Sequence, residues 1–366
     1  ARLAQTGRVE LSTTPHDHPL APLLVDFAAA RDTRPEAPLP AAPRYPGGAE
    51  RLRDHVDLAL ATHAQRFGTP ARGVWPAEGA LSNAVLRVLG EAGVAWSASG
   101  EGVLANSLRR AGQPTDRRAN HLYRPYRVGD GPGPLCFFRD DRLSDLIGFE
   151  YAKWHSHEAA ASFVAELEAI ARSAPEDETP LVSVILDGEN CWEFYPYNGF
   201  FFLETLYARL ESHPAIRMTT FADAVAGTGA AERPPAHRGT LPGLVAGSWV
   251  YGDLSTWIGS TDKNRAWDLL VAAKEACDRV LATGRLDAPA RERVLRQLAA
   301  LEASDWFWWL GDYNPAAAVA SFEAVYRANL VRLYEMLGEA PPAALAEPIG
   351  KGSGHPEIGG AMRRST

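Results

Sequence analysis

A continuous apolar run over residues 181–186, LVSVIL, constrains the fold of this chain most strongly. A strand exposed on one face alternates apolar and polar residues, whereas a strand covered on both faces reads as an unbroken apolar run. The run therefore predicts a strand inside a parallel sheet with helices on both of its faces. Asp187 follows at once, which predicts a carboxylate at the carboxyl end of that strand.

Short β-rich runs alternate with helical patterns over the first two thirds of the chain, as expected for right-handed βαβ units. The six predicted strands cover residues 7–14, 73–76, 94–97, 135–139, 181–186 and 216–219. Helices are predicted at 49–67, 81–92, 158–174 and 199–212. Six parallel strands fit either an open doubly wound sheet or a barrel without its first strand. The abrupt start at Ala1 favours the second arrangement.

The amino-acid composition changes near residues 228–247. This stretch is rich in Pro and Gly and predicts a linker or long loop. Helical patterns dominate beyond it, at 264–282, 289–302 and 315–337. We therefore expect a β/α catalytic domain over 1–235 and a helical domain over 236–340. The last stretch, 341–366, is rich in Pro, Gly and Ala and predicts a loosely ordered tail.

Composition restricts the partners that we expect. The formal net charge of −8 disfavours nucleic acid. The three cysteines, Cys136, Cys191 and Cys277, are widely spaced and form no CxxC pair, so neither a disulfide framework nor a structural zinc site is predicted. A reducing, cytoplasmic location follows from this. No apolar stretch is long enough for a membrane helix, and no cofactor-binding glycine motif is present, so we predict no membrane partner and no cofactor. Oligomeric state is not readable.

The segment GVWPAEG at 73–79 places Glu78 just past a predicted strand and before a helix. In a β/α barrel, that position lies on the catalytic face. The dipole of the following helix favours an ionised carboxylate, as a nucleophile requires. The alternative is a glutamate that only caps the helix.

The segment DGEN at 187–190 gives a stronger indication. A cluster of acids directly after a buried strand is costly unless the acids are used or paired. Aromatic residues follow, among them Trp192 and Tyr197, and Glu189 lies within the cluster. Two carboxylates at different strand ends, Glu78 and Asp187, supply what glycoside hydrolysis requires: a nucleophile or base, and an acid. A helix cap with surface acids is the competing interpretation.

Other polar residues follow predicted strands. His16 and His18 come after the first strand and are candidates for bonding sugar hydroxyls. A metal site is the sharper alternative, because His and Asp are metal ligands, but no complementary group has persuasive spacing and we predict no metal. Arg139 and Asp140 end another strand. They are substrate-binding candidates, although a structural ion pair involving Arg139 fits equally well.

Ten tryptophans are a high count, and many lie beside Gly, Pro, Asp or Glu rather than on helical stripes. Exposed aromatic faces stack on sugar rings while neighbouring polar groups bond hydroxyls. The nine residues SDWFWWLGD at 304–312 predict a helix-end platform over the barrel mouth, although core packing fits some of these side chains equally well. The candidates for substrate binding in this class are Trp75, Trp192, Trp257, Asp305, Trp306, Trp308 and Trp309.

Six ordered blocks resemble glycoside hydrolase family 57, particularly its amylopullulanase-like branch. They read STTPHDHPLAPLL, GVWPAEGA, FRDDRLSDLIGF, LDGENCWEFYPYNGFFFLETLY, TWIGSTDKNRAWD and SDWFWWLGD, and span about 7–337. The resemblance implies a (β/α)7 barrel followed by a helical domain, acting on α-1,4-linked and, as a further option, α-1,6-linked glucans. It also implies that Glu78 is the nucleophile, Asp187 the acid/base and His18 a subsite residue. The His-Gln-Pro type of opening motif is absent, which suggests that the first strand is missing.

Several functions stay open on the sequence alone. The leading prediction is a retaining α-glucan hydrolase. A branching enzyme or 4-α-glucanotransferase would use the same site. A non-catalytic glucan-binding module and a metal-dependent deacetylase-like barrel are alternatives from other classes.

Overall fold

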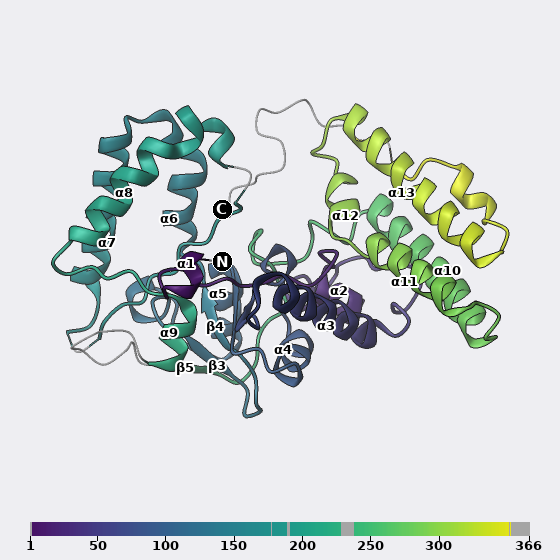
Figure 1. Cartoon of the computed structure of the whole chain (residues 1–366), viewed down its shortest axis with the longest axis horizontal. Helices are drawn as coiled ribbons and strands as arrows, with labels where there is room; N and C mark the ends of the chain where they lie inside the picture. The colour runs from purple at the N-terminus through teal and green to yellow at the C-terminus, as the bar shows by residue number, and fades with distance from the viewer. Residues whose placement is uncertain (1, 177, 189–190, 228–237, 351, 353–366) are drawn as a thin grey trace.

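A mostly parallel sheet lies at the centre of the chain, as a computed structural model shows (Figure 1). The structure describes every residue except 1, 177, 189–190, 228–237, 351 and 353–366. The strands are β1 (Gly73–Val74), β2 (Trp96–Ser99), β3 (Tyr126–Val128), β4 (Leu135–Phe138) and β5 (Gly239–Leu241), in the order β1-β2-β4-β3-β5. β1, β2 and β4 are mutually parallel, β3 is antiparallel to β4, and β5 is parallel to β3.

Helices surround this sheet. The helices that precede β3 in the chain are α1 (Arg2–Gln5), α2 (Ala21–Val25), α3 (Gly48–Phe67), α4 (Asn83–Glu91), α5 (Glu101–Arg110), and the short η1 (Phe27–Asp32), η2 (Ala77–Gly79) and η3 (Arg118–Asn120). The next group is α6 (Asp141–Asp145), η4 (Leu146–Glu150), η5 (Tyr151–Lys153), α7 (Ser156–Ser173), η6 (Cys191–Phe194), η7 (Pro196–Gly199), α8 (Phe200–Ser212) and α9 (Phe221–Ala226). The last group is α10 (Thr261–Ala282), α11 (Ala288–Leu301), α12 (Asp305–Trp309), α13 (Ala316–Leu337) and η8 (Ala343–Ala346).

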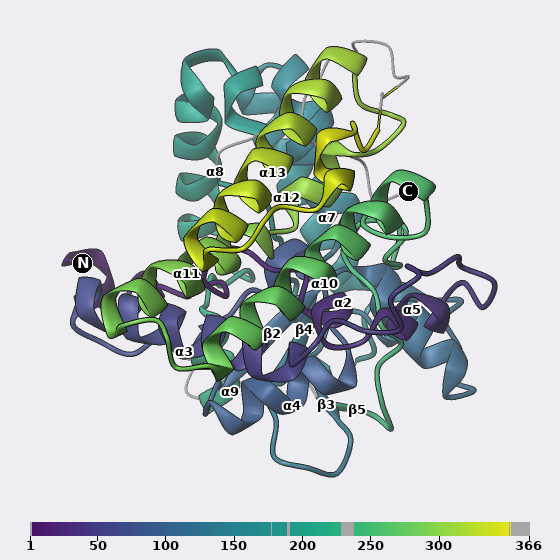
Figure 2. The same ribbon diagram turned by 90° about the vertical axis from the view of Figure 1, so that its right-hand side faces the viewer.

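Two helical groups stand on opposite sides of the sheet region. Figure 1 places α7 and α8 on the left and α10, α11 and α13 on the right, and Figure 2 shows the second group in front with α8 behind it. α10, α11 and α13 share a core with α12, where the Trp267 ring stacks on Phe307 with 3.9 Å between ring centroids. The predicted α/β class, with a parallel β/α region followed by helices, is confirmed.

The predicted helices are confirmed as α3, α4, α7, α8, α10, α11 and α13, and their boundaries follow local capping chemistry. Ser82, Ser260 and Asp287 each accept a backbone N–H with their side chain at a helix start. α3 and α13 end at Gly68 and Gly338, which adopt the left-handed conformation that glycine tolerates.

Three predicted strands are wrong as strands. Residues 7–14 contribute one parallel bridge, between Thr13 and Val74, and residues 216–219 contain no strand. The apolar run at 181–186 also forms one parallel bridge, between Ser183 and Arg139, and most of its side chains are half-buried. The order of neighbours is nevertheless that expected of sequential βαβ units: the Thr13 segment, β1, β2, β4, then the Ser183 segment.

The interpretation of residues 228–247 as a linker needs correction. Residues 228–237 lie outside the described part of the chain, but β5 follows directly. Leu244, Val245 and Ala246 are buried, and Leu81 exchanges two backbone hydrogen bonds with Gly247. Residues 244–247 are therefore packed into the core beside α4 and do not form an exposed linker.

The limits of the two predicted domains and the tail stay predictions. Within the predicted tail, η8 forms, and Leu345 and Ile349 are buried. Arg327 on α13 donates to the Leu345 carbonyl, so this part of the tail is packed against α13.

A buried carboxylate joins α3 to the end of α11. Glu302 is fully buried and accepts hydrogen bonds from Arg51 Nε and Nη2 at 2.9 and 2.8 Å and from His55 Nε2 at 2.7 Å. Burial by itself raises the pKa of Glu302, but the bonds from His55 and Arg51 outweigh it and lower the pKa to about 2.

We expect Glu302→Gln to destabilise the protein by about 3–5 kcal/mol at pH 7, because it leaves the buried Arg51 with only the exposed Asp54 as an anionic partner. A carboxyl with a depressed folded-state pKa stabilises above its unfolded pKa, near 4.5, and this contribution disappears as the pH falls toward 2. The difference between wild type and variant in urea unfolding should therefore shrink below pH 4.5. Glu292→Gln, which breaks an exposed pair with Arg296, is the matched control and should change stability by less than about 1 kcal/mol. An equal effect of both variants would contradict the role given to Glu302.

Candidate active site

Glu78 lies in a strained turn directly after β1. Its φ of 59° is in the left-handed region, which is rare for residues other than glycine and costs on the order of 1–3 kcal/mol. Contacts on both sides hold the turn: Trp249 N donates to the Glu78 carbonyl at 3.1 Å, and Ser99 Oγ donates to the Gly79 carbonyl at 2.5 Å. A Cβ at Gly79 would lie 2.8 Å from the Trp75 ring, so glycine is required there.

The Glu78 carboxylate accepts two hydrogen bonds from distant parts of the chain. Ser304 Oγ donates to Oε1 at 3.0 Å, and Trp249 Nε1 donates to Oε2 at 3.4 Å. Burial raises the pKa of Glu78, the two donors lower it, and the charges of Asp187 and Asp305 raise it further, to about 7. The expectation that a helix dipole favours ionisation is therefore wrong. α4 begins only at Asn83, with Ser82 as its cap, and burial dominates at Glu78.

Asp187 lies close enough to Glu78 for its charge to raise the pKa of Glu78. The segment that leads to it is attached to the end of β4: Asp140 N donates to the Ser183 carbonyl at 2.7 Å, and Arg139 Nε donates to the Ile185 carbonyl at 2.8 Å. The charge of Asp187 thus reaches Glu78, although the two carboxylates follow separate segments of the chain. Glu189, the third predicted acid, lies outside the described residues.

His18 is connected to Glu78 through Ser304. His18 Nδ1 lies 2.9 Å from Ser304 Oγ, and the Ser304 N–H donates to the His18 carbonyl at 2.9 Å. An antiparallel bridge between Pro19 and Ala303 holds the two segments together. Sequence reasoning missed Ser304, although it opens the SDWFWWLGD block and precedes Asp305.

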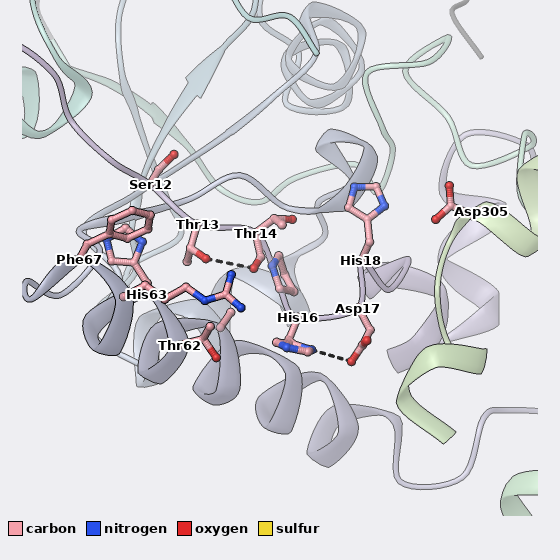
Figure 3. A pocket seen from close by; sticks show the side chains of 13 residues that line it. Ser12, Thr13, Thr14, His16, Asp17, His18, Thr62, His63, Phe67 and Asp305 are labelled. Carbon is pink, nitrogen blue, oxygen red and sulfur yellow. Dashed lines mark hydrogen bonds and ion pairs between the residues drawn. The ribbon is translucent and has the colours of Figure 1, made fainter. Parts of the chain in front are cut away.

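A cavity of about 510 Å³ lies between the 12–18 segment, α3 and Asp305 (Figure 3). His16, His18 and Asp305 all line it, so three of the predicted substrate-binding residues meet at one cavity. His18 and Asp305 are neighbours at one end, and Phe67 and His63 lie at the other. His16 Nδ1 bonds Asp17 Oδ2 at 2.7 Å. The end with His18 and Asp305 is the one connected to Glu78.

Arg139 and Asp140 are committed to structural contacts. Arg139 forms ion pairs with Asp141 and Asp145 at 2.9 and 2.8 Å, as the structural ion-pair interpretation expects, and its binding role stays a prediction. Its guanidinium also lies 5.5 Å from the centroid of the Trp249 ring.

The assignment of Asp140 to the substrate needs correction. Only 1% of Asp140 is exposed, and its carboxylate accepts from Arg118, the Tyr123 hydroxyl and Leu143 N. These donors occupy the acceptor positions that a sugar hydroxyl would need. The bond from Leu143 N makes Asp140 the N-terminal cap of α6.

The tryptophan candidates divide by burial. Trp257 is 0% exposed and Trp308 is 7% exposed, so neither presents a face to a sugar and their assignment as substrate-binding residues is corrected: both are core side chains. Trp75 is half-buried and packs edge-on against Trp249, at 5.2 Å between centroids.

Trp192, Trp306 and Trp309 are also half-buried. The Trp309 ring stacks on Phe322, Trp306 Nε1 donates to the Ala300 carbonyl, and Trp192 packs against Tyr195. Their binding roles stay predictions.

The described residues contain no group of three or more His, Cys, Asp or Glu side chains placed to hold a metal ion. The rings of His155 and His157 stack on each other with 5.6 Å between their centroids. Among the described helices, none combines the length and the apolar character needed to cross a membrane.

Comparison with solved structures shows that the fold is shared. A family 57 branching enzyme from Thermococcus kodakaraensis is 16% identical, with a TM-score of 0.59 over 99% of this chain and 77% of that one. An α-amylase from Thermotoga maritima is 16% identical, with a TM-score of 0.65 over 92% and 68% of the two chains. A 4-α-glucanotransferase from Thermococcus litoralis is 15% identical, with a TM-score of 0.57 over 91% and 49%.

The sequence itself gives the assignment. The model of Glycosyl hydrolase family 57 matches residues 1–236, which is well over half of the chain and includes both Glu78 and Asp187. The resemblance noted in the sequence blocks is thereby confirmed, and the chain belongs to glycosyl hydrolase family 57.

Proposed function

We propose that this chain is a retaining glycoside hydrolase that acts on α-glucans, with α-1,4 linkages as the main target and α-1,6 linkages as a further one. Family membership supports the reaction class. The names of the similar structures, an α-amylase, branching enzymes and a 4-α-glucanotransferase, support an α-glucan substrate. Starch, glycogen and pullulan are the polymers to be compared. A cytoplasmic location stays a prediction.

The observation that carries the proposal is the buried Glu78 carboxylate, which Ser304 Oγ and Trp249 Nε1 hold at 3.0 and 3.4 Å and whose pKa the charge of Asp187 helps to raise. We assign Glu78 as the nucleophile and Asp187 as the acid/base. Glu78 attacks the anomeric carbon while Asp187 protonates the leaving glycosidic oxygen. Asp187 then takes a proton from water, which displaces Glu78 from the glycosyl-enzyme. A retaining mechanism requires the two carboxyl groups to lie about 5–5.5 Å apart.

The surroundings of Glu78 support binding of a neutral sugar. His18 and Asp305 border the adjacent cavity and offer hydrogen-bonding groups, and the half-buried Trp75 supplies apolar surface beside the turn. We assign His16, His18, Asp305 and Trp75 to substrate binding, with Trp192, Trp306 and Trp309 as outer contacts.

Transfer is the second candidate, because two kinds of transferase are among the similar structures. In a branching enzyme or glucanotransferase, a sugar hydroxyl instead of water resolves the glycosyl-enzyme, with the same two carboxylates. A glucan-binding module without catalysis would not need a buried acid beside a second one.

We expect Glu78→Gln and Asp187→Asn each to lower kcat/KM by on the order of 10²–10⁴ or more, because each removes a group that acts in the transition state. Release of reducing ends from maltoheptaose measures this. Glu204→Gln, an exposed change on α8, is the control and should retain the wild-type rate. A near-normal rate in either site variant would remove that residue from its assigned role.

Product analysis separates hydrolysis from transfer. On incubation with starch, pullulan and maltoheptaose, a hydrolase raises the number of reducing ends. A transferase redistributes chain lengths at a constant number of reducing ends, and a branching enzyme forms new α-1,6 linkages. We expect reducing ends to increase, and chain redistribution without that increase would favour the second candidate.

The pH dependence follows from the raised pKa of Glu78, which burial places at about 7. A nucleophilic carboxylate must be ionised, so kcat/KM should rise roughly tenfold per pH unit below 7 and level off above it on this limb. Stopped assays on maltoheptaose from pH 4 to 9 measure the profile. An acidic limb with its midpoint near the ordinary glutamate value of 4.5 would contradict the environment described for Glu78.

A further inference from the structure

Ser304 occupies an unusual place between two titratable side chains. It is fully buried, and its hydroxyl oxygen lies 2.9 Å from His18 Nδ1 and 3.0 Å from Glu78 Oε1. Its backbone N–H is fixed on the His18 carbonyl, and Glu302, two residues earlier, is anchored by Arg51. The hydroxyl is thus held at a defined position at the junction of α11 and α12.

A serine hydroxyl carries one proton and can therefore donate to only one of these neighbours at a time. If His18 Nδ1 bears a proton and donates to Oγ, then Ser304 donates to an ionised Glu78. If Glu78 is protonated and donates to Oγ, then Ser304 donates to an unprotonated Nδ1. The two bond directions reverse together, because a single hydrogen position determines both.

We propose that Ser304 is a positioning residue that couples the ionisation of Glu78 to that of His18 by relaying a proton between them. This inference rests on the proposed role of Glu78 as the nucleophile. In the forward direction, Glu78 Oε1 gives its proton to Ser304 Oγ, and the hydroxyl proton of Ser304 passes to His18 Nδ1. The result is a carboxylate and an imidazolium, with Ser304 unchanged.

The relay answers a requirement of the site. A buried glutamate with a raised pKa must lose its proton before it attacks, and its surroundings repel the ionised form through the Asp187 and Asp305 carboxylates. Two hydrogen-bond donors favour that form, Ser304 Oγ and Trp249 Nε1. His18 borders the 510 Å³ cavity, so a proton on its imidazole can leave for solvent through that cavity before the sugar binds.

The ionisable residues that line the cavity with His18 are His16, Asp17, His63, Arg66 and Asp305. Because Glu78 and His18 share one hydroxyl, each of their titrations should depend on the state of the other.

NMR titration of the full-length chain tests the relay without any substrate. The Glu78 carboxyl carbon is assigned by its absence in Glu78→Gln, and the His18 ring by nitrogen-15 shifts. We expect Ser304→Ala to raise the Glu78 midpoint by about one to two pH units, since it removes a hydrogen bond that stabilises the ionised form. Ser82→Ala, which removes another buried serine hydroxyl at the start of α4, is the control and should leave both midpoints unchanged.

A double-mutant comparison separates the relay from a through-space effect. Glu78→Gln should shift the His18 midpoint when Ser304 is present, and this shift should fall to less than half in the Ser304→Ala background. The acidic limb of kcat/KM on maltoheptaose should move upward with the Glu78 midpoint. A full-sized His18 shift in the Ser304→Ala background, or an unchanged Glu78 midpoint, would overturn the proposal.

The two failures are distinguishable. If the chain neither hydrolyses nor rearranges glucans, the proposed function fails while the NMR midpoints still report the coupling. If the chain is active and Glu78→Gln is inactive, but Ser304→Ala leaves both titrations and the acidic limb in place, then the relay alone fails.

Discussion

The buried carboxylate of Glu302 is the constraint on which the rest of the structure depends. An ionised group without water is tolerated only when it is fully paired, and Arg51 and His55 on α3 supply that pairing. The pairing fixes the end of α11 against α3. Because Ser304 and Asp305 follow directly, the helical part of the chain delivers its polar groups to Glu78 at a set position.

The candidate site is therefore assembled from four separate regions. The turn after β1 supplies Glu78, the segment beside β4 supplies Asp187, the loop after Thr13 supplies His18, and the α11–α12 junction supplies Ser304. Each is held by backbone or ion-pair contacts that do not involve the substrate. Arg139 illustrates this, because it ties the Ile185 carbonyl to Asp141 and Asp145. The site is preorganised, which is what stabilisation of a charged transition state requires.

Sequence reasoning located seven of the described helices and the parallel neighbours of the sheet, because periodicity and apolar runs are local signals. The catalytic roles of Glu78 and Asp187 stay predictions. Sequence reasoning failed where the tertiary environment decides. The run at 181–186 has strand composition but forms one bridge, and Trp257 has a sugar-binding context but is enclosed by core. The role of Ser304 could not be predicted from its own segment, since its partners lie more than two hundred residues away in the chain.

At Glu78, the left-handed backbone lowers the stability of the fold, while the proposed reaction requires the carboxylate at that position. At a φ of 59°, glycine would relax the turn, yet glycine would bring no carboxylate. Selection for stability alone would favour replacing this glutamate, so its presence at such a position reflects a compromise in which the fold tolerates local strain to keep an acid aimed inward. A thermostabilisation campaign guided only by backbone geometry would select against this residue.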